Sequence, residues 1–148
     1  MTILNFSKKI FLFFKHTFRR FITHPLGKKN PIIPIIKFAK LKLLFFLGGK
    51  KLILPWVYKI NFLFLNDDWT NSLNYYLGLG DFEEMSFMLN ILEEKDIFLD
   101  IGANIGSYSI LLSKLRKVKS ISFEPIPETY NNLCINIFSN DLSSLVFP

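Results

Sequence analysis

Cysteine is almost absent from this chain of 148 residues. Cys134 is its single cysteine, and His16 and His24 are its two histidines. One thiol cannot form an internal disulfide, and these scattered residues do not form the Cys and His cluster that a structural zinc ion needs. The sequence therefore excludes a domain held together by internal disulfides, and it predicts no metal site.

Acidic residues are missing from the first part of the chain. Residues 1–66 contain 13 Lys and Arg and no Asp or Glu, whereas residues 67–148 contain 5 basic and 12 acidic residues. The two parts carry charges of +13 and −7, which sum to the net charge of +6. Such an asymmetry indicates a basic arm attached to a different kind of unit.

The arm begins with an amphipathic pattern. Between Thr2 and Ile22, Ile and Phe recur at three- and four-residue steps, and Lys, His and Arg fall on the opposite arc. This pattern predicts a helix that lies either on an anionic membrane surface or on its own domain with the basic face in water. Basic segments also bind nucleic acid, but no nucleic-acid-binding motif is found. We therefore expect no nucleic-acid partner.

Long hydrophobic runs are also lacking. A membrane-spanning helix needs about 20 mostly apolar residues, and Pro and Lys interrupt every apolar stretch before that length. We expect a cytoplasmic protein, with residues 2–22 able to contact the inner face of the membrane peripherally. Pro31 and Pro34 predict an extended start to the apolar segment that follows them.

The composition divides the chain into three regions. Residues 1–50 form the basic apolar region, residues 51–80 a small β-meander and residues 81–148 the remainder. Within the meander, residues 51–65 are rich in Ile, Leu and Phe, and Leu73–Gly78 is interpreted as a return strand.

The last region alternates strand and helix patterns. A helix is expected at residues 81–94, followed by the strand Ile97–Asp100 and a helix beginning at Ser107. A second strand ends at Glu124, a second helix follows Pro127, and a third strand begins near the end. The order β-α-β-α-β predicts an α/β fold of the Rossmann-like class, with a parallel sheet truncated after about three strands.

The candidate ligand site lies where these strands end. In parallel α/β sheets, ligands bind beyond the carboxyl ends of the strands, where Asp100 and Glu124 are placed. Gly102 and Gly106 have no Cβ, so their backbone can approach a ligand closely. Glu124 follows Gly106 by eighteen residues. An acid at this position is suited to accept hydrogen bonds from ribose hydroxyls.

Two common nucleotide motifs are absent. The dinucleotide motif G-x-G-x-x-G fails because Asn104 stands where the second glycine belongs. No G-x-x-x-x-G-K-[ST] sequence is found either, which argues against a P-loop.

The sequence instead resembles the FkbM-type methyltransferases, which are S-adenosylmethionine-dependent enzymes of the Rossmann-like class. The first matching motif is "DIGANIG" and the second is "FEP", followed by a helix with a tyrosine, a leucine and a late asparagine. The matching positions are Asp100, Gly102, Ala103, Asn104, Gly106, Phe123, Glu124, Pro125, Tyr130, Leu133 and Asn136. The resemblance covers about residues 73–148.

The resemblance implies a cofactor and residue roles. Gly102, Ala103, Asn104 and Gly106 would line the methionine part of S-adenosylmethionine. Asp100 would order the glycine loop, and Glu124 would hold the ribose. The implied reaction is O-methylation of a hydroxyl on a sugar, glycan or related metabolite, which makes a small molecule or glycan the expected acceptor. The catalytic base is not identified.

The family's sheet has more strands than this chain provides. We therefore expect a fragment that lacks the acceptor side of the site and does not catalyse methyl transfer alone. The alternative is a non-catalytic protein that works at a membrane surface or as an interaction module, with a decayed Rossmann-like fold.

Overall fold

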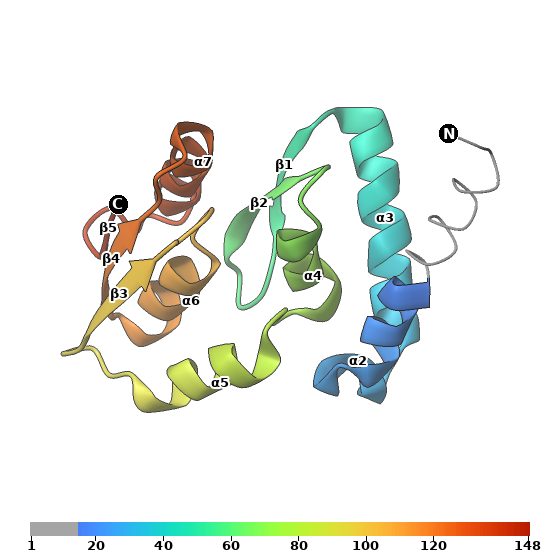
Figure 1. The fold of residues 1–148 in the computed structure, drawn as a ribbon, viewed down its shortest axis with the longest axis horizontal. Coiled ribbons are helices and arrows are strands. Elements are labelled where there is room, and N and C mark those ends of the chain that lie inside the picture. The colour runs from blue at the N-terminus through green and yellow to red at the C-terminus, as the bar shows by residue number, and fades with distance from the viewer. Residues whose placement is uncertain (1–14) are drawn as a thin grey trace.

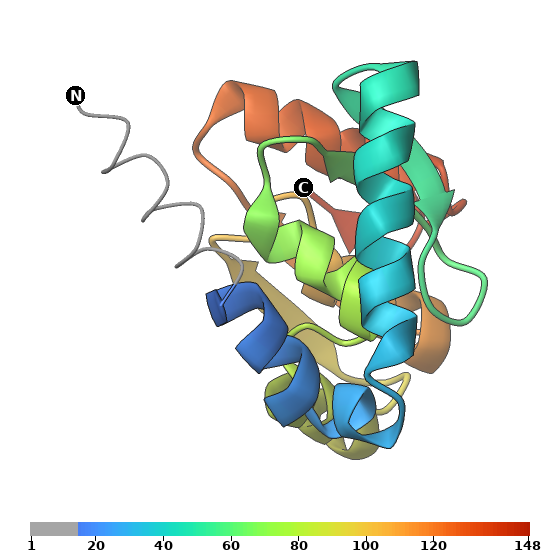
Figure 2. The same ribbon diagram turned by 90° about the vertical axis from the view of Figure 1, so that its right-hand side faces the viewer.

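The computed structural model of the chain describes residues 15–148, and Figures 1 and 2 show their arrangement. The first layer is helical and lies at the end of the molecule opposite the parallel sheet (Figure 1). It consists of a helical segment at residues 15–23, α2 at Pro25–Lys29 and α3 at Ile32–Gly48. The amphipathic helix expected at residues 2–22 is helical from residue 15 onward, and its first part lies outside the described residues.

The extended start predicted for the segment after Pro31 is wrong, because α3 begins there. Pro31 is the N-cap of this helix and Pro34 lies in its first turn. The first backbone N–H groups of a helix have no partner within the helix, so a proline there loses no hydrogen bond. The Asn30 side chain also accepts a hydrogen bond from Ile32 N at 3.1 Å.

The second layer is a hairpin followed by a helix. β1 (Lys51–Pro55) and β2 (Asn61–Leu65) pair antiparallel, and α4 spans Trp69–Leu77. The return strand predicted at Leu73–Gly78 is therefore wrong. Asp68 accepts a hydrogen bond from Asn71 N at 3.0 Å and caps α4. Every residue of α4 from Asn71 onward is buried, so tertiary packing overrides the β-propensity of its aromatic residues.

The third layer contains the predicted alternation. The elements are α5 (Phe82–Ile91), β3 (Ile97–Ile101), α6 (Ser107–Arg116), β4 (Lys119–Phe123), α7 (Pro127–Phe138) and β5 (Val146–Phe147). The sheet order is β3-β4-β5, and both strand pairs are parallel. The expected α/β fold with a short parallel sheet of three strands is confirmed.

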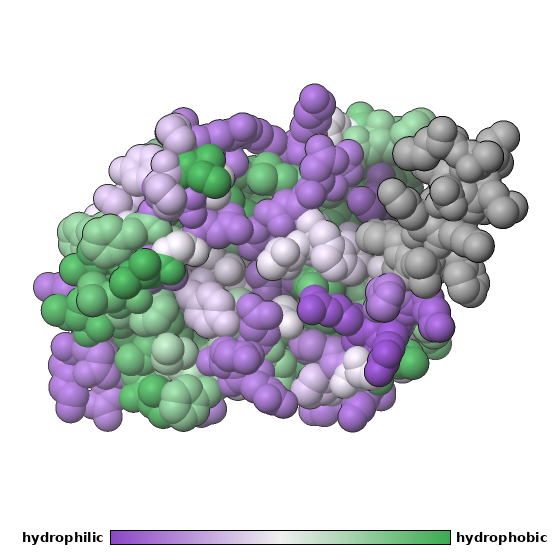
Figure 3. Space-filling view, viewed as in Figure 1, coloured by the Kyte–Doolittle hydropathy of each residue, from purple (hydrophilic) through white to green (hydrophobic). Residues whose placement is uncertain are grey.

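The two faces of this sheet differ. On one face, Ser120 and Ser122 of β4 are buried against α6. On the other face, Ile97, Leu99 and Ile101 of β3 are 62%, 56% and 82% exposed. Hydrophobic residues accordingly gather on the surface over the three-stranded sheet (Figure 3). The described residues thus cover only one face of the sheet.

Within residues 15–148, no helix has the length and apolar character needed to cross a membrane. The same residues contain no group of three or more His, Cys, Asp or Glu arranged to hold a metal ion.

Candidate functional site

The site is built where β3 and β4 end. In the turn after β3, the Gly102 and Ala103 N–H groups both donate to the carbonyl of Phe123, each at 2.9 Å. These bonds fasten the turn to the end of β4. The positive φ angles of Gly102 (82°) and Asn104 (51°) fold the backbone sharply before α6 begins.

Glu124 joins the two strand ends. Its Oε2 accepts a hydrogen bond from Asn104 N at 3.0 Å, and its Oε1 accepts one from Ile126 N at 2.9 Å. A carboxylate offers about four lone-pair positions, so each oxygen of Glu124 can still accept a hydrogen bond from a ligand hydroxyl. The half-buried side chain is therefore fixed in place and remains able to bind.

Asp100 is directed towards α6 and away from the turn. Its Oδ2 accepts hydrogen bonds from Ser109 N at 3.3 Å and from the Ser109 hydroxyl. Ser109 Oγ also lies 2.8 Å from the buried Ser122 Oγ, which continues the chain of polar contacts between α6 and β4. Burial raises the pKa of Asp100, and the hydrogen bonds from Ser109 oppose this rise. Asp100 thus anchors the first turn of α6 behind the site.

The two glycines of the motif have different roles. A Cβ built on Gly106 would lie 2.4 Å from Leu133 Cδ1 of α7, so glycine is needed there for helix packing. A Cβ built on Gly102 would meet no atom within 4 Å. Gly102 therefore leaves open space beside the backbone where a ligand could lie, whereas Gly106 is buried.

A third support comes from Asn136, which carries no role in the sequence-based prediction. Its Oδ1 accepts a hydrogen bond from Leu63 N at 2.7 Å, and its Nδ2 donates to Ile105 O at 2.7 Å. This buried amide links β2 of the hairpin, α7 and the turn after β3. The sequence pointed to Asn136 in one way, because this residue is the late asparagine of the family motif.

The six predicted site residues thus fall into two groups. Gly102, Asn104 and Glu124 lie together at the open side of the strand ends. Asp100, Ala103 and Gly106 lie behind them, in contacts that hold the turn and α6. The open group suits a ribosyl cofactor, because it combines an exposed backbone turn with a fixed carboxylate that has accepting capacity left. Its assignment to a cofactor stays a prediction.

Comparison with known proteins gives one significant curated match. No family model matches the chain, so membership of the FkbM-type methyltransferases stays a prediction. Over 68 residues the chain is 35% identical to the tRNA(Phe) (4-demethylwyosine(37)-C(7)) aminocarboxypropyltransferase of Methanocaldococcus jannaschii. The match covers 45% of this chain and 27% of that enzyme. The chain therefore spans about a quarter of the length of this relative.

Two solved structures show a weaker likeness. An RNA methyltransferase from Salinibacter ruber in complex with S-adenosyl-L-homocysteine has a TM-score of 0.41, with 19% identity and 44% of each chain covered. TYW2 of P. horikoshii in complex with MeSAdo has a TM-score of 0.49, with 17% identity and coverage of 81% of this chain and 48% of that one. Both scores lie below 0.5, so the fold is taken from the strand order of the chain itself.

The curated match corrects the expectation that nucleic acid is not a partner. That expectation is wrong, because the 35% identical segment belongs to an enzyme named for a tRNA substrate. The sequence-based exclusion relied on the absence of a motif. Cations alternating with aromatic residues also suit nucleic acid, since single strands bind to basic grooves whose aromatic side chains stack with bases. The match supports neither a sugar or glycan acceptor nor the non-catalytic alternative.

Proposed function

We propose that the chain binds S-adenosylmethionine at the ends of β3 and β4 and serves in the transfer of its methyl group to RNA. One observation carries this proposal: the carboxylate of Glu124 is fixed against the turn that contains Gly102 and Asn104. The curated match to a tRNA-modifying enzyme supports the class of acceptor. Residues 81–148 would form the cofactor-binding part, with residues 51–80 packed against it, and the basic region of residues 1–50 precedes them in the sequence.

Each residue of the open group has a defined task. Glu124 would accept hydrogen bonds from the two ribose hydroxyls while its present bonds hold it in place. The open side of Gly102 would admit the methionine part close to the backbone. Asp100 would keep α6 at a fixed distance from the turn. Acceleration in such a site comes mainly from positioning the acceptor in line with the reacting bond.

The chemistry of the cofactor leaves two transfer reactions to separate. Its sulfonium sulfur carries both a methyl and a 3-amino-3-carboxypropyl group, and a nucleophile can displace the sulfur from either carbon. Methyl transfer releases S-adenosylhomocysteine, and aminocarboxypropyl transfer releases methylthioadenosine. Methyl transfer is the first candidate. The name of the curated relative favours aminocarboxypropyl transfer as the second candidate.

The test is to identify the adenosyl product. The chain is incubated with S-adenosylmethionine and a mixed tRNA pool, and the small molecules are separated by chromatography. RNA-dependent formation of S-adenosylhomocysteine supports methyl transfer, and formation of methylthioadenosine supports the second candidate. Glu83→Gln, an exposed change on α5, serves as the control for Glu124→Gln. The absence of both products in the presence of RNA would contradict transfer by this chain alone, and it would agree with the expectation that the chain is a fragment without the acceptor side of the site.

A further inference from the structure

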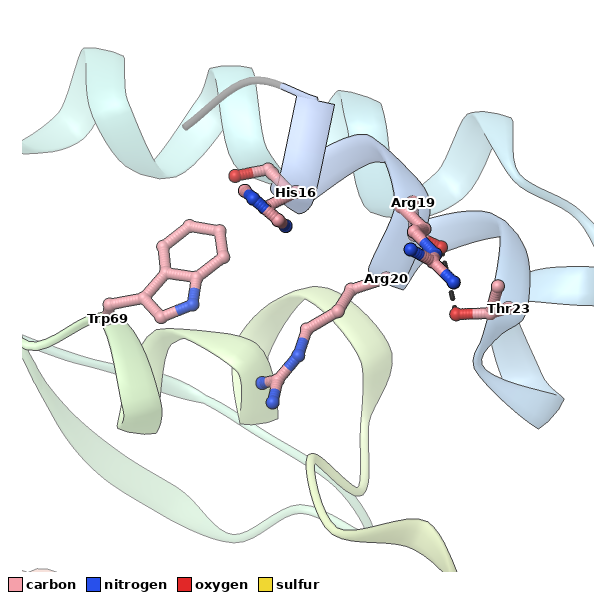
Figure 4. Close-up of a pocket in the computed structure, with 6 residues that line it drawn as sticks. His16, Arg19, Arg20, Thr23 and Trp69 are labelled. Carbon is pink, nitrogen blue, oxygen red and sulfur yellow. Dashed lines mark hydrogen bonds between the residues drawn. The ribbon is translucent and has the colours of Figure 1, made fainter. Parts of the chain in front are cut away.

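A cavity of about 380 Å³ lies between the helical segment at residues 15–23 and the start of α4. Its lining combines cations, hydroxyls and one indole: His16, Thr17, Arg19, Arg20, Thr23 and Trp69. Figure 4 shows Trp69 projecting from α4 towards the helix that carries His16, with the Arg20 side chain reaching down beside it. None of these residues belongs to the candidate cofactor site.

Arg19 and Arg20 bring two positive charges to the lining of the cavity. Residues 1–66 contain no acid, and within residues 15–148 neither Arg19 nor Arg20 forms a salt bridge. Two acids, Asp67 and Asp68, precede the indole in the sequence, and Asp68 is directed to the start of α4, where it accepts hydrogen bonds from the Asn71 backbone and side chain. The arginines are exposed, so their guanidinium groups are available to an anion.

The chemistry of the lining fits a nucleotide. Unpaired RNA bases stack on Trp, His or the plane of an Arg guanidinium, and phosphates are bound by arginine through paired hydrogen bonds. The volume lies within the usual range for small-ligand pockets. Trp69 is half-buried, so its indole is held in position beside the cations.

From this geometry we propose that the cavity binds a single-stranded segment of the RNA substrate, with one base stacked on Trp69 and the adjoining phosphates on Arg19 and Arg20. The inference rests on the proposed function, because it identifies where that RNA is held away from the reacting base.

The fold makes this contact a separate binding site. α4 packs against β2, and β2 is hydrogen-bonded to Asn136 of α7, which in turn bonds to Ile105 of the turn after β3. Figure 1 shows the β1–β2 hairpin between α4 and the three-stranded sheet, at whose strand ends the open group of cofactor residues lies. Changes in the cavity should weaken RNA binding and leave the affinity for the cofactor unchanged.

The experiment measures binding of a fluorescein-labelled RNA hairpin with a single-stranded loop to the full chain by fluorescence anisotropy. Trp69→Ala should weaken binding about 5- to 150-fold, the range expected when one base no longer stacks. Trp69→Phe should restore most of the affinity, because phenylalanine also stacks.

A second variant carries its substitutions outside α4, so it tests the site without disturbing that helix. Arg19→Gln/Arg20→Gln removes two exposed cations, so we expect weaker binding. The slope of the logarithm of affinity against the logarithm of salt concentration should become shallower by about 0.7 for each phosphate that is no longer neutralised. The matched control is Lys95→Gln/Lys119→Gln, which removes two exposed charges far along the sequence and should bind RNA as the wild type does.

Calorimetry with S-adenosylhomocysteine on the same proteins separates the two proposals. Loss of RNA binding with unchanged cofactor affinity supports the RNA site. If the arginine variant and Trp69→Ala both bind RNA as tightly as the control, the proposed RNA site is wrong. The proposal that RNA is the substrate would still stand. A wild-type chain that binds the cofactor but no RNA would also overturn the proposed RNA site. A chain that binds RNA through Trp69 but does not bind the cofactor would overturn only the proposed function.

Discussion

The carboxylate of Glu124 accepts a hydrogen bond from the backbone N–H of Asn104 at 3.0 Å, across the ends of two neighbouring parallel strands. This bond makes the acid at the end of β4 part of the turn after β3. A residue twenty positions away in the sequence therefore fixes the conformation of that turn. The shape of the candidate cofactor site and its main polar ligand are consequently determined together.

The two glycines of the turn should respond differently to alanine. Both have φ above +80°, so alanine is strained at either position by about 1–2 kcal/mol. Gly106→Ala would in addition drive its Cβ against Leu133, which adds about 1–3 kcal/mol of overpacking. We expect urea denaturation to show a larger loss of stability for Gly106→Ala than for Gly102→Ala. Equal losses would contradict the packing role of Gly106.

Gly102→Ala serves as the matched control and carries an expectation of its own. Its Cβ would occupy open space, so the variant should remain folded and lose affinity for S-adenosylhomocysteine. A folded variant with wild-type affinity would show that the cofactor does not lie beside Gly102.

Asn136 should matter more for stability than a neighbouring asparagine on the same helix. Asn136→Ala leaves the Leu63 N–H and the Ile105 carbonyl without their partner, at a cost of about 1–3 kcal/mol for each buried group. Asn131 is exposed on α7, so Asn131→Ala should change the free energy of unfolding by less than about 0.5 kcal/mol. Similar losses in the two variants, measured by urea denaturation, would refute the bridging role.

Asp100 should make the stability of the chain depend on pH. Burial raises its pKa in the folded state above the ordinary value of 3.8, so the folded protein holds this proton more tightly than the unfolded chain. Stability from this group is therefore present at low pH and is lost as the pH rises through the folded pKa. Asp100→Asn does not ionise, so its stability relative to the wild type should rise with pH and then level off.

The measurement is urea denaturation of both proteins at a series of pH values from acid to neutral. The quantity compared is the free energy of unfolding of Asp100→Asn minus that of the wild type. If this difference stays constant or falls as the pH rises, burial does not raise the pKa of Asp100.

The sequence predicted the β-α-β-α-β part of the fold because its signals are local. Strand and helix periodicities, the glycine turn and Pro127 at the start of α7 each act within a few residues. The prediction failed at Leu73–Gly78 because burial among aromatic side chains, together with the Asp68 cap, favours a helix there. Such packing is set by residues distant in the sequence.

The position of the site could be predicted from the sequence, but the directions of its side chains could not. Strand order alone places Asp100 and Glu124 at one edge of the sheet, but it does not give the direction of their side chains. Asp100 turns towards Ser109 and Glu124 towards Asn104, and both contacts depend on the packed positions of α6 and β4. The cavity beside Trp69 joins this residue to Arg19 and Arg20, about fifty positions earlier, so no local pattern could reveal it.

The most direct test of the cofactor site is calorimetric titration of the full chain with S-adenosylhomocysteine, using wild type, Glu124→Gln and the exposed control Glu83→Gln. Loss of a hydrogen bond to a charged group lowers affinity by about tenfold to a hundredfold, so Glu124→Gln should bind that much more weakly. Glu83→Gln should match the wild type. Absence of binding by the wild type, or equal binding by Glu124→Gln, would contradict the account.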